Sequence, residues 1–189
     1  MQRGLAGPMP SSESSPGARG RPPSGAGHYL RDLVYGATDG VVTTLAVVAG
    51  ATAAGFGGAV AVVLGIANLA ADGFSMGASN YLGLKSELQQ TGASVADEMP
   101  ARHGLATFAS FVVAGSAPLL AFAVPGLGAR PTFALSAALS ALALLGVGAA
   151  RSSFTGEPRW RAGLEVLAIG GAAAGAAYAV GALVAPLLH

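Results

Sequence analysis

The strongest constraint in this sequence is a set of long stretches that contain no charged residue. Leu105–Ala129 has 25 such residues, Thr132–Ala150 has 19 and Val166–Leu188 has 23. A helix needs about 20 mostly apolar residues to cross the hydrocarbon core of a membrane. Each stretch is therefore long enough for one membrane span, and each contains small residues that allow helices to pack closely in lipid.

A fourth uncharged stretch, Val41–Ala71, has 31 residues, which is too long for one ordinary span and too short for two. The glycine-rich segment 55–58 indicates a turn inside it. Two spans and a turn need roughly 40 residues, so this pair of helices must extend outward at both ends. That extension brings Asp39 and Asp72 into the membrane.

The composition agrees with a membrane protein. Apolar residues make up 52% of the chain and charged residues only 10%, whereas a soluble domain has about 25% charged residues. The net charge of +1 provides no basic field, so we expect no nucleic-acid partner. The chain has no cysteine and none of the common hydrolase, P-loop or dinucleotide-binding motifs, so we do not expect an enzyme.

We therefore predict an all-α integral membrane protein with five transmembrane helices. Their approximate ranges are 33–55, 58–84, 105–126, 132–150 and 163–187, within one membrane domain over residues 28–189. Residues 1–27 are rich in Pro, Gly, Ser and Arg, and we interpret them as a disordered cytosolic tail. Of the ten basic residues, only Arg130 falls on the second side of the membrane, which predicts a cytosolic N-terminus and an external C-terminus.

The two intramembrane carboxylates are predicted to lie at similar depths. At 1.5 Å per helical residue, Asp39 lies ~24 Å and Asp72 ~21 Å inward from the glycine turn. Met76 lies about one turn further, at ~27 Å, while Asp32 and Asn80 reach ~34 and ~33 Å, at the cytosolic mouth.

The spacing also places polar groups on shared helix faces. Residues four apart form a stripe along one side of a helix, and residues seven apart share a face, as Asp32 and Asp39 do. The stripe of the second span consists of Asn68, Asp72, Met76 and Asn80, and further candidates for polar lining are Ser75 and Thr43. Two GxxxG pairs that allow close helix packing stand beside these residues, namely Gly36 with Gly40 and Gly73 with Gly77.

A carboxylate inside a membrane costs at least ~2.5–3.5 kcal/mol, so two of them require an explanation. No Lys or Arg is predicted at their depth, which leaves a passing cation or a proton as the partner. Carboxylates combined with a thioether favour Fe²⁺ or Mn²⁺. Because carboxylates also bind protons, metal and H⁺ can compete for them, which is the physical basis of a metal/proton antiporter.

Structural roles are the alternative for each of these side chains. Asp72 could be a protonated acid that donates a hydrogen bond to a neighbouring helix. Asn68 and Asn80 could join helices by hydrogen bonds, and Met76 could simply fill space in the core. The three histidines are scattered along the sequence, and we do not expect them to bind metal.

Two long motifs resemble the vacuolar iron transporter (VIT) family. The run RDLVYGATDGVVTT at residues 31–44 resembles the first helix of that family. The run GIANLAADGFSMG at residues 65–77, followed by NYL and KSE, resembles its second helix. Weaker likeness at residues 110–120 and 163–171 extends the resemblance over about residues 28–188.

The resemblance implies a five-helix protomer that dimerises, with an ion path at the two-fold interface and export of cytosolic Fe²⁺, often Mn²⁺ too, in exchange for H⁺. It implies that Asp39 and Met76 line the metal path and that Asp32 lies nearer the cytosolic mouth. Asn68 stands where plant and fungal-type members carry Glu, and Asp72 could supply that carboxylate one turn further on. The connection over residues 85–104 is too short for the Glu-rich cytosolic domain of those members.

We therefore expect a homodimeric Fe²⁺ or Mn²⁺ exporter that works by H⁺ antiport, with the metal as transported substrate rather than as a bound cofactor. A non-transporting membrane scaffold and a transporter of another divalent cation are the alternatives. The missing Glu-rich domain and the lack of a targeting peptide favour a bacterial plasma membrane. The predicted central site comprises Asp39, Asp72 and Met76, and the predicted cytosolic entrance comprises Asp32, Asn80 and Glu87.

Overall fold

The computed structural model describes residues 27–188, so most of the predicted cytosolic tail, together with residue 189, lies outside the described part of the chain. The described residues form helices and connections only. The helices are α1 (Gly27–Ala53), α2 (Gly58–Thr91), α3 (Val95–Glu98), α4 (Pro100–Gly115), the 3₁₀ helix η1 (Ala117–Ala123), α5 (Ala129–Thr155) and α6 (Arg159–Leu188).

Five helical segments of the described chain are long and apolar enough to cross a membrane, which confirms the predicted all-α architecture with five candidate spans. Several of them are longer than the predicted spans. The 34 residues of α2 correspond to a length of ~51 Å, well beyond the ~30 Å hydrocarbon core, so this helix projects past the membrane interior. The five segments are Tyr29–Ala53, Gly58–Thr91, Pro100–Ala123, Ala129–Thr155 and Arg159–Leu187.

Glycine and proline residues determine where the helices end. Gly92 and Gly156 adopt the left-handed conformation at φ 69°, and their N–H groups donate to the carbonyls of Leu88 and Ser152, which caps α2 and α5. The third span changes from α4 to η1 just before Pro118, whose ring removes the backbone donor that an α-helix would need.

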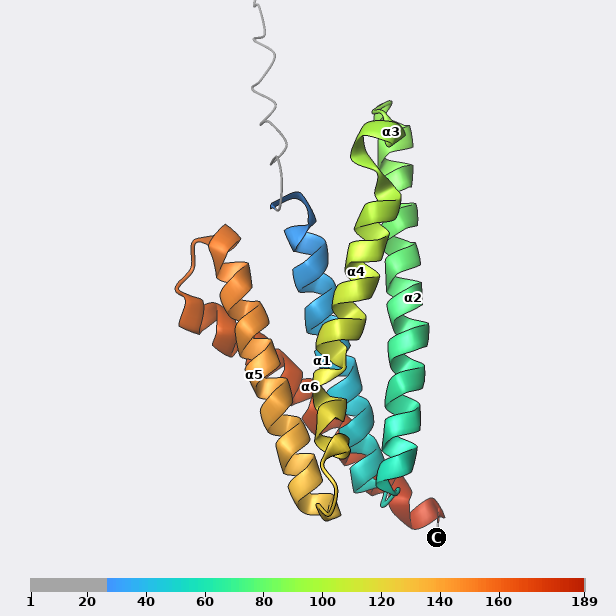
Figure 1. Cartoon of the computed structure of the whole chain (residues 1–189), viewed down its shortest axis with the longest axis vertical. Helices are drawn as coiled ribbons and strands as arrows, with labels where there is room; N and C mark the ends of the chain where they lie inside the picture. The colour runs from blue at the N-terminus through green and yellow to red at the C-terminus, as the bar shows by residue number, and fades with distance from the viewer. Residues whose placement is uncertain (1–26, 189) are drawn as a thin grey trace, which may run out of the picture.

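The long helices run up and down the bundle, with α1 near its centre (Figure 1). Helix α1 packs against α4, α6, α5 and α2, most extensively against α4 and α6. Val41, Leu144 and Val166 form a buried cluster that joins α1, α5 and α6. The start of α1, helix α3 and the α5–α6 connection lie at one end of the bundle, and the α1–α2 turn and the C-terminal end lie at the other (Figure 1).

Helix α4 serves as a common backing for α1 and α2. A Cβ atom on Gly40 would overlap the backbone oxygen of Phe111, and one on Gly77 would lie 2.7 Å from the backbone oxygen of Gly104. Such contacts bring the backbones of both helices against α4 and therefore hold α1 and α2 side by side. A Cβ atom added to any of the four glycines of the two GxxxG pairs would meet atoms of α4. These glycines are Gly36, Gly40, Gly73 and Gly77.

Candidate functional site

A cavity of about 550 Å³ lies between α1 and α2 and contains the predicted central residues. We call it the central cavity. This volume is large enough for a cation together with several water molecules. Its lining residues are Arg31, Asp32, Tyr35, Asp39, Asp72, Ser75, Met76, Ser79 and Asn80.

Helical periodicity explains why these side chains meet. The lining residues of α1 and of α2 recur at intervals of three or four, so each helix turns one polar face toward the cavity. Asp39 and Met76 are half-buried, whereas Asp72 and Ser75 are exposed on the single protomer. The cavity is therefore open on the side that faces away from the helix bundle.

The central cavity offers the carboxylates of Asp32, Asp39 and Asp72 and the thioether of Met76. Its one basic side chain, Arg31, lies two helical turns from Asp39, toward the start of α1. Across residues 27–188, no three His, Cys, Asp or Glu side chains converge closely enough to hold a metal ion. A cation in this cavity would thus be held by Asp39, Asp72, the Met76 sulfur and water, a donor set that suits a divalent transition metal.

The three predicted entrance residues line a second cavity, of about 400 Å³, which we call the mouth cavity. Asp32 and Asn80 line both cavities, while Glu87 lines only the mouth cavity and is exposed. The remaining residues of the mouth cavity are Arg31, Ser79, Gly83, Leu84, Glu98 and His103.

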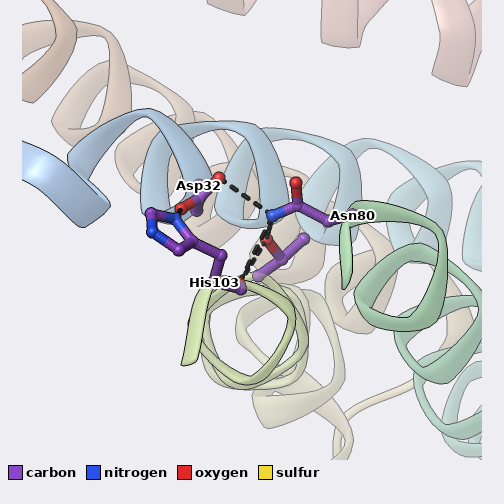
Figure 2. Close-up of polar contacts among 4 residues, drawn as sticks. Asp32, Asn80 and His103 are labelled. Atoms are coloured by element: carbon purple, nitrogen blue, oxygen red, sulfur yellow. Dashed lines mark hydrogen bonds and ion pairs between the residues drawn. The ribbon is translucent and has the colours of Figure 1, made fainter. Parts of the chain in front are cut away.

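Asp32 is held by donors from two other helices, as Figure 2 shows. Its Oδ1 atom accepts a hydrogen bond of 2.9 Å from the Nδ2 atom of Asn80 on α2. Its Oδ2 atom lies 2.5 Å from the Nδ1 atom of His103 on α4. When Asp32 is ionised its carboxylate can only accept hydrogen bonds, and His103 is then the donor in that contact. Asp32 is 8% exposed and His103 6%, so the contact is buried.

Neither His103 nor Thr107 was among the site residues predicted from the sequence. Both residues belong to the hydrogen-bonded cluster, since Asn80 Nδ2 also donates to Thr107 Oγ1 at 2.7 Å, and Thr107 Oγ1 donates to the His103 carbonyl at 3.0 Å. A signal was present in the sequence. His103 and Thr107 are four residues apart, so they share one face of an otherwise apolar helix.

Thr43 and Asn68 lie one turn beyond Asp39 and Asp72 and contact each other. Asn68 Nδ2 donates to Thr43 Oγ1 at 3.2 Å, and Thr43 Oγ1 donates to the Asp39 carbonyl at 2.8 Å. The pair therefore links α1 to α2 on the side of the central cavity that is nearer the α1–α2 turn. Its suggested role as polar lining of the ion path stays a prediction.

Comparison with known proteins shows similarity to one family. The chain matches the VIT family model over residues 30–99 and 89–182. A segment of 62 residues is 39% identical to Vacuolar iron transporter 1 of Eucalyptus grandis and, equally, to that of Arabidopsis thaliana. A segment of 59 residues is 37% identical to the vacuolar iron transporter of Toxoplasma gondii.

These aligned segments are short relative to the proteins compared. They cover 33% of this chain but 25% of the two plant proteins, and 31% of this chain but 20% of the Toxoplasma protein. The family model reaches much further, because its two matches together extend from residue 30 to residue 182. This match covers well over half of the chain, and the protein therefore belongs to the VIT family.

Proposed function

We propose that this protein carries Fe²⁺ or Mn²⁺ out of the cytosol in exchange for H⁺. The observation that carries the proposal is the central cavity, in which Asp39, Asp72 and Met76 line one space between two candidate membrane spans. The names of the relatives add support, since those proteins are called vacuolar iron transporters.

The energetics of the cavity explain why a cation and protons would alternate there. An intramembrane carboxylate without a partner is costly, and Asp39 and Asp72 double that cost in one place. Either a divalent metal or two protons would compensate both negative charges. Release of metal on one side can therefore be coupled to proton uptake from that side, because both species need the same oxygens.

The exposed side of the cavity supports a homodimer. Asp72 is exposed on the single protomer, and Tyr35 beside it in the cavity lining is 64% exposed. A carboxylate that faced lipid at this depth would be strongly disfavoured. A second copy placed over the cavity would exclude lipid from it and could complete the metal coordination.

The distribution of basic residues supports export from the cytosol. Arg31, Lys85 and Arg151 lie toward the end of the bundle where α1 starts, while Arg130 lies at the start of α5, at the other end. Because basic residues tend to remain on the cytosolic side, this distribution supports a mouth cavity that opens toward the cytosol. The relatives are named for the vacuole, so they lend no support to the bacterial plasma membrane predicted from the sequence.

Metal flux in proteoliposomes tests the proposal. A metal-quenched dye is loaded inside, Fe²⁺ or Mn²⁺ is added outside under an imposed pH gradient, and Asp39→Asn is compared with wild type. We expect quenching that depends on the proton gradient in wild type and its loss in the variant. Glu157→Gln is the matched control, because it also neutralises one acid but lies in the exposed α5–α6 connection.

The same experiment separates transport from a scaffold role. If wild type and Asp39→Asn both give only leak-level signals while remaining folded and dimeric by size-exclusion chromatography, transport of these metals is refuted. A scaffold would also tolerate Asp39→Asn or gain stability from it, because the substitution removes an intramembrane charge. Replacing Fe²⁺ and Mn²⁺ by Co²⁺ in the same assay tests the alternative of another divalent cation.

A further inference from the structure

The central cavity and the mouth cavity meet at a shared set of residues. Four side chains or backbone segments line both cavities, and the boundary between the two spaces therefore runs through them. We call this boundary the neck. Its members are Arg31, Asp32, Ser79 and Asn80. An ion that travels between α1 and α2 from the mouth cavity to Asp39 passes the neck.

A hydrogen bond crosses the neck. Asn80 Nδ2 on α2 donates to Asp32 Oδ1 on α1 at 2.9 Å, so two of the four neck residues are joined to each other (Figure 2). The bond ties α1 to α2, the two helices that contribute residues to both cavities. Its position along the path, not only its burial, distinguishes it from the Thr43–Asn68 contact further along the same helices.

Helix α4 anchors both partners of this bond from behind. His103 Nδ1 contacts the second carboxylate oxygen of Asp32 at 2.5 Å, and Thr107 Oγ1 accepts a 2.7 Å hydrogen bond from Asn80. Thr107 is fully buried, and His103 and Asp32 are nearly so. With one oxygen bound to α4 and the other to α2, the carboxylate has a single orientation across the neck.

We propose that His103 is a positioning residue that holds Asp32 in the neck and so controls passage between the mouth cavity and the central cavity. This role rests on the proposed function, because the ion that passes the neck would be the transported metal. His103 does not need to touch the metal in this role. It acts through the carboxylate that it orients, and loss of its N–H leaves Asp32 free to turn away from Asn80.

Cysteine accessibility tests this role without measuring transport, and the chain suits the method because it has no native cysteine. Ser75→Cys reports on the central cavity and Leu84→Cys on the mouth cavity, since each residue lines only one of the two. Both reporters are reacted in membrane vesicles with a membrane-impermeant trimethylammonium methanethiosulfonate. The measured quantity is the modification rate at position 75 divided by that at position 84.

We expect His103→Leu to raise this ratio roughly tenfold or more, the factor that loss of a hydrogen bond to a charged group provides. His103→Asn should restore the wild-type ratio, because its side-chain amide can donate from the place of Nδ1. If His103 only filled space, the ratio would not depend on whether the substituted side chain has an N–H group near the place of Nδ1. Thr107→Val is a second, nearly isosteric variant, and it should raise the ratio in the same direction because it removes the nearer of the two α4 acceptors of Asn80 Nδ2, the other being the His103 carbonyl at 3.3 Å.

Two results would overturn the proposal. One is an unchanged ratio in folded His103→Leu and in Thr107→Val. The other is a His103→Asn protein with the same raised ratio as His103→Leu. If His103→Leu does not fold, Thr107→Val alone decides the outcome. A protein that moves no metal would still give a ratio, so failure of the proposed transport activity and failure of the positioning role are distinguishable.

Discussion

The close contacts of Gly40 and Gly73 with α4 predict how much Gly→Ala substitutions should change the stability of the protein. Gly83, which makes no such contact, serves as the control. At Gly40 the new Cβ would overlap the backbone oxygen of Phe111. At Gly73 it would meet ring atoms of Phe111 at 3.1 Å and of Phe108 at 3.3 Å. At Gly83, also on α2, it would have no other atom within 4 Å. The added methyl group therefore meets backbone atoms at Gly40, side-chain atoms that can move at Gly73, and open space at Gly83.

The expected stability changes follow from these surroundings. Gly40→Ala should cost about 1–3 kcal/mol, because relief of the overlap requires α1 to move away from α4. Gly73→Ala should cost about 1 kcal/mol or less, since a shift of the rings by a few tenths of an ångström removes the crowding. Gly83→Ala should be neutral or stabilise by about 0.5–1 kcal/mol, because alanine loses less chain entropy than glycine in a helix.

Thermal unfolding in detergent, followed by fluorescence-detected size-exclusion chromatography, measures these differences. At roughly 2–4 °C per kcal/mol for a domain of this size, Gly40→Ala should lower Tm by about 2–12 °C. The rank order of Tm should be Gly83→Ala, then Gly73→Ala, then Gly40→Ala. If the Tm of Gly40→Ala equals that of wild type, or exceeds that of Gly73→Ala, the inference that α1 packs directly against the α4 backbone is refuted.

Three further predictions concern individual side chains. Met76→Leu keeps the volume but removes the sulfur, so it should leave Tm unchanged while raising the KM for Fe²⁺ in the flux assay. Asn80→Leu leaves the buried oxygens of Asp32 and Thr107 without their donor and should cost about 1–3 kcal/mol in thermal unfolding. Arg151→Ala breaks the 2.7 Å contact with Glu165, a largely solvent-accessible pair, and should cost less than about 1 kcal/mol, with a smaller difference in high salt.

The local part of this architecture was predictable because it depends on spacing alone. The number of spans follows from the lengths of the charge-free stretches, and the position of Asp39 and Asp72 follows from the length that two helices and a turn require. The polar face of α2 follows from the interval of four residues between Asp72, Met76 and Asn80. These relations hold within one helix or one hairpin, so no knowledge of tertiary packing is needed.

The contacts of α4 were not predictable in the same way. The sequence shows that Gly36, Gly40, Gly73 and Gly77 can support close packing, but it does not show which helix approaches them. Likewise, His103 is separated from Asp32 by 71 positions, and only the fold brings the two together. The spacing of four between His103 and Thr107 indicates a polar face on α4, but it does not identify the residues that this face contacts.

Helix α4 therefore matters for the site although the central cavity is lined by α1 and α2 alone. Periodicity determines which side chains those two helices turn toward each other, but the distance between the helices depends on their contacts with α4. At Gly40 and Gly77 the helix backbones are packed so closely against α4 that a methyl group would not fit between them. The hydrogen bonds of His103 and Thr107 also join α4 to α1 and to α2. It follows that substitutions on α4 can change the separation of α1 and α2, and with it the width of the central cavity, without altering any side chain that lines this cavity.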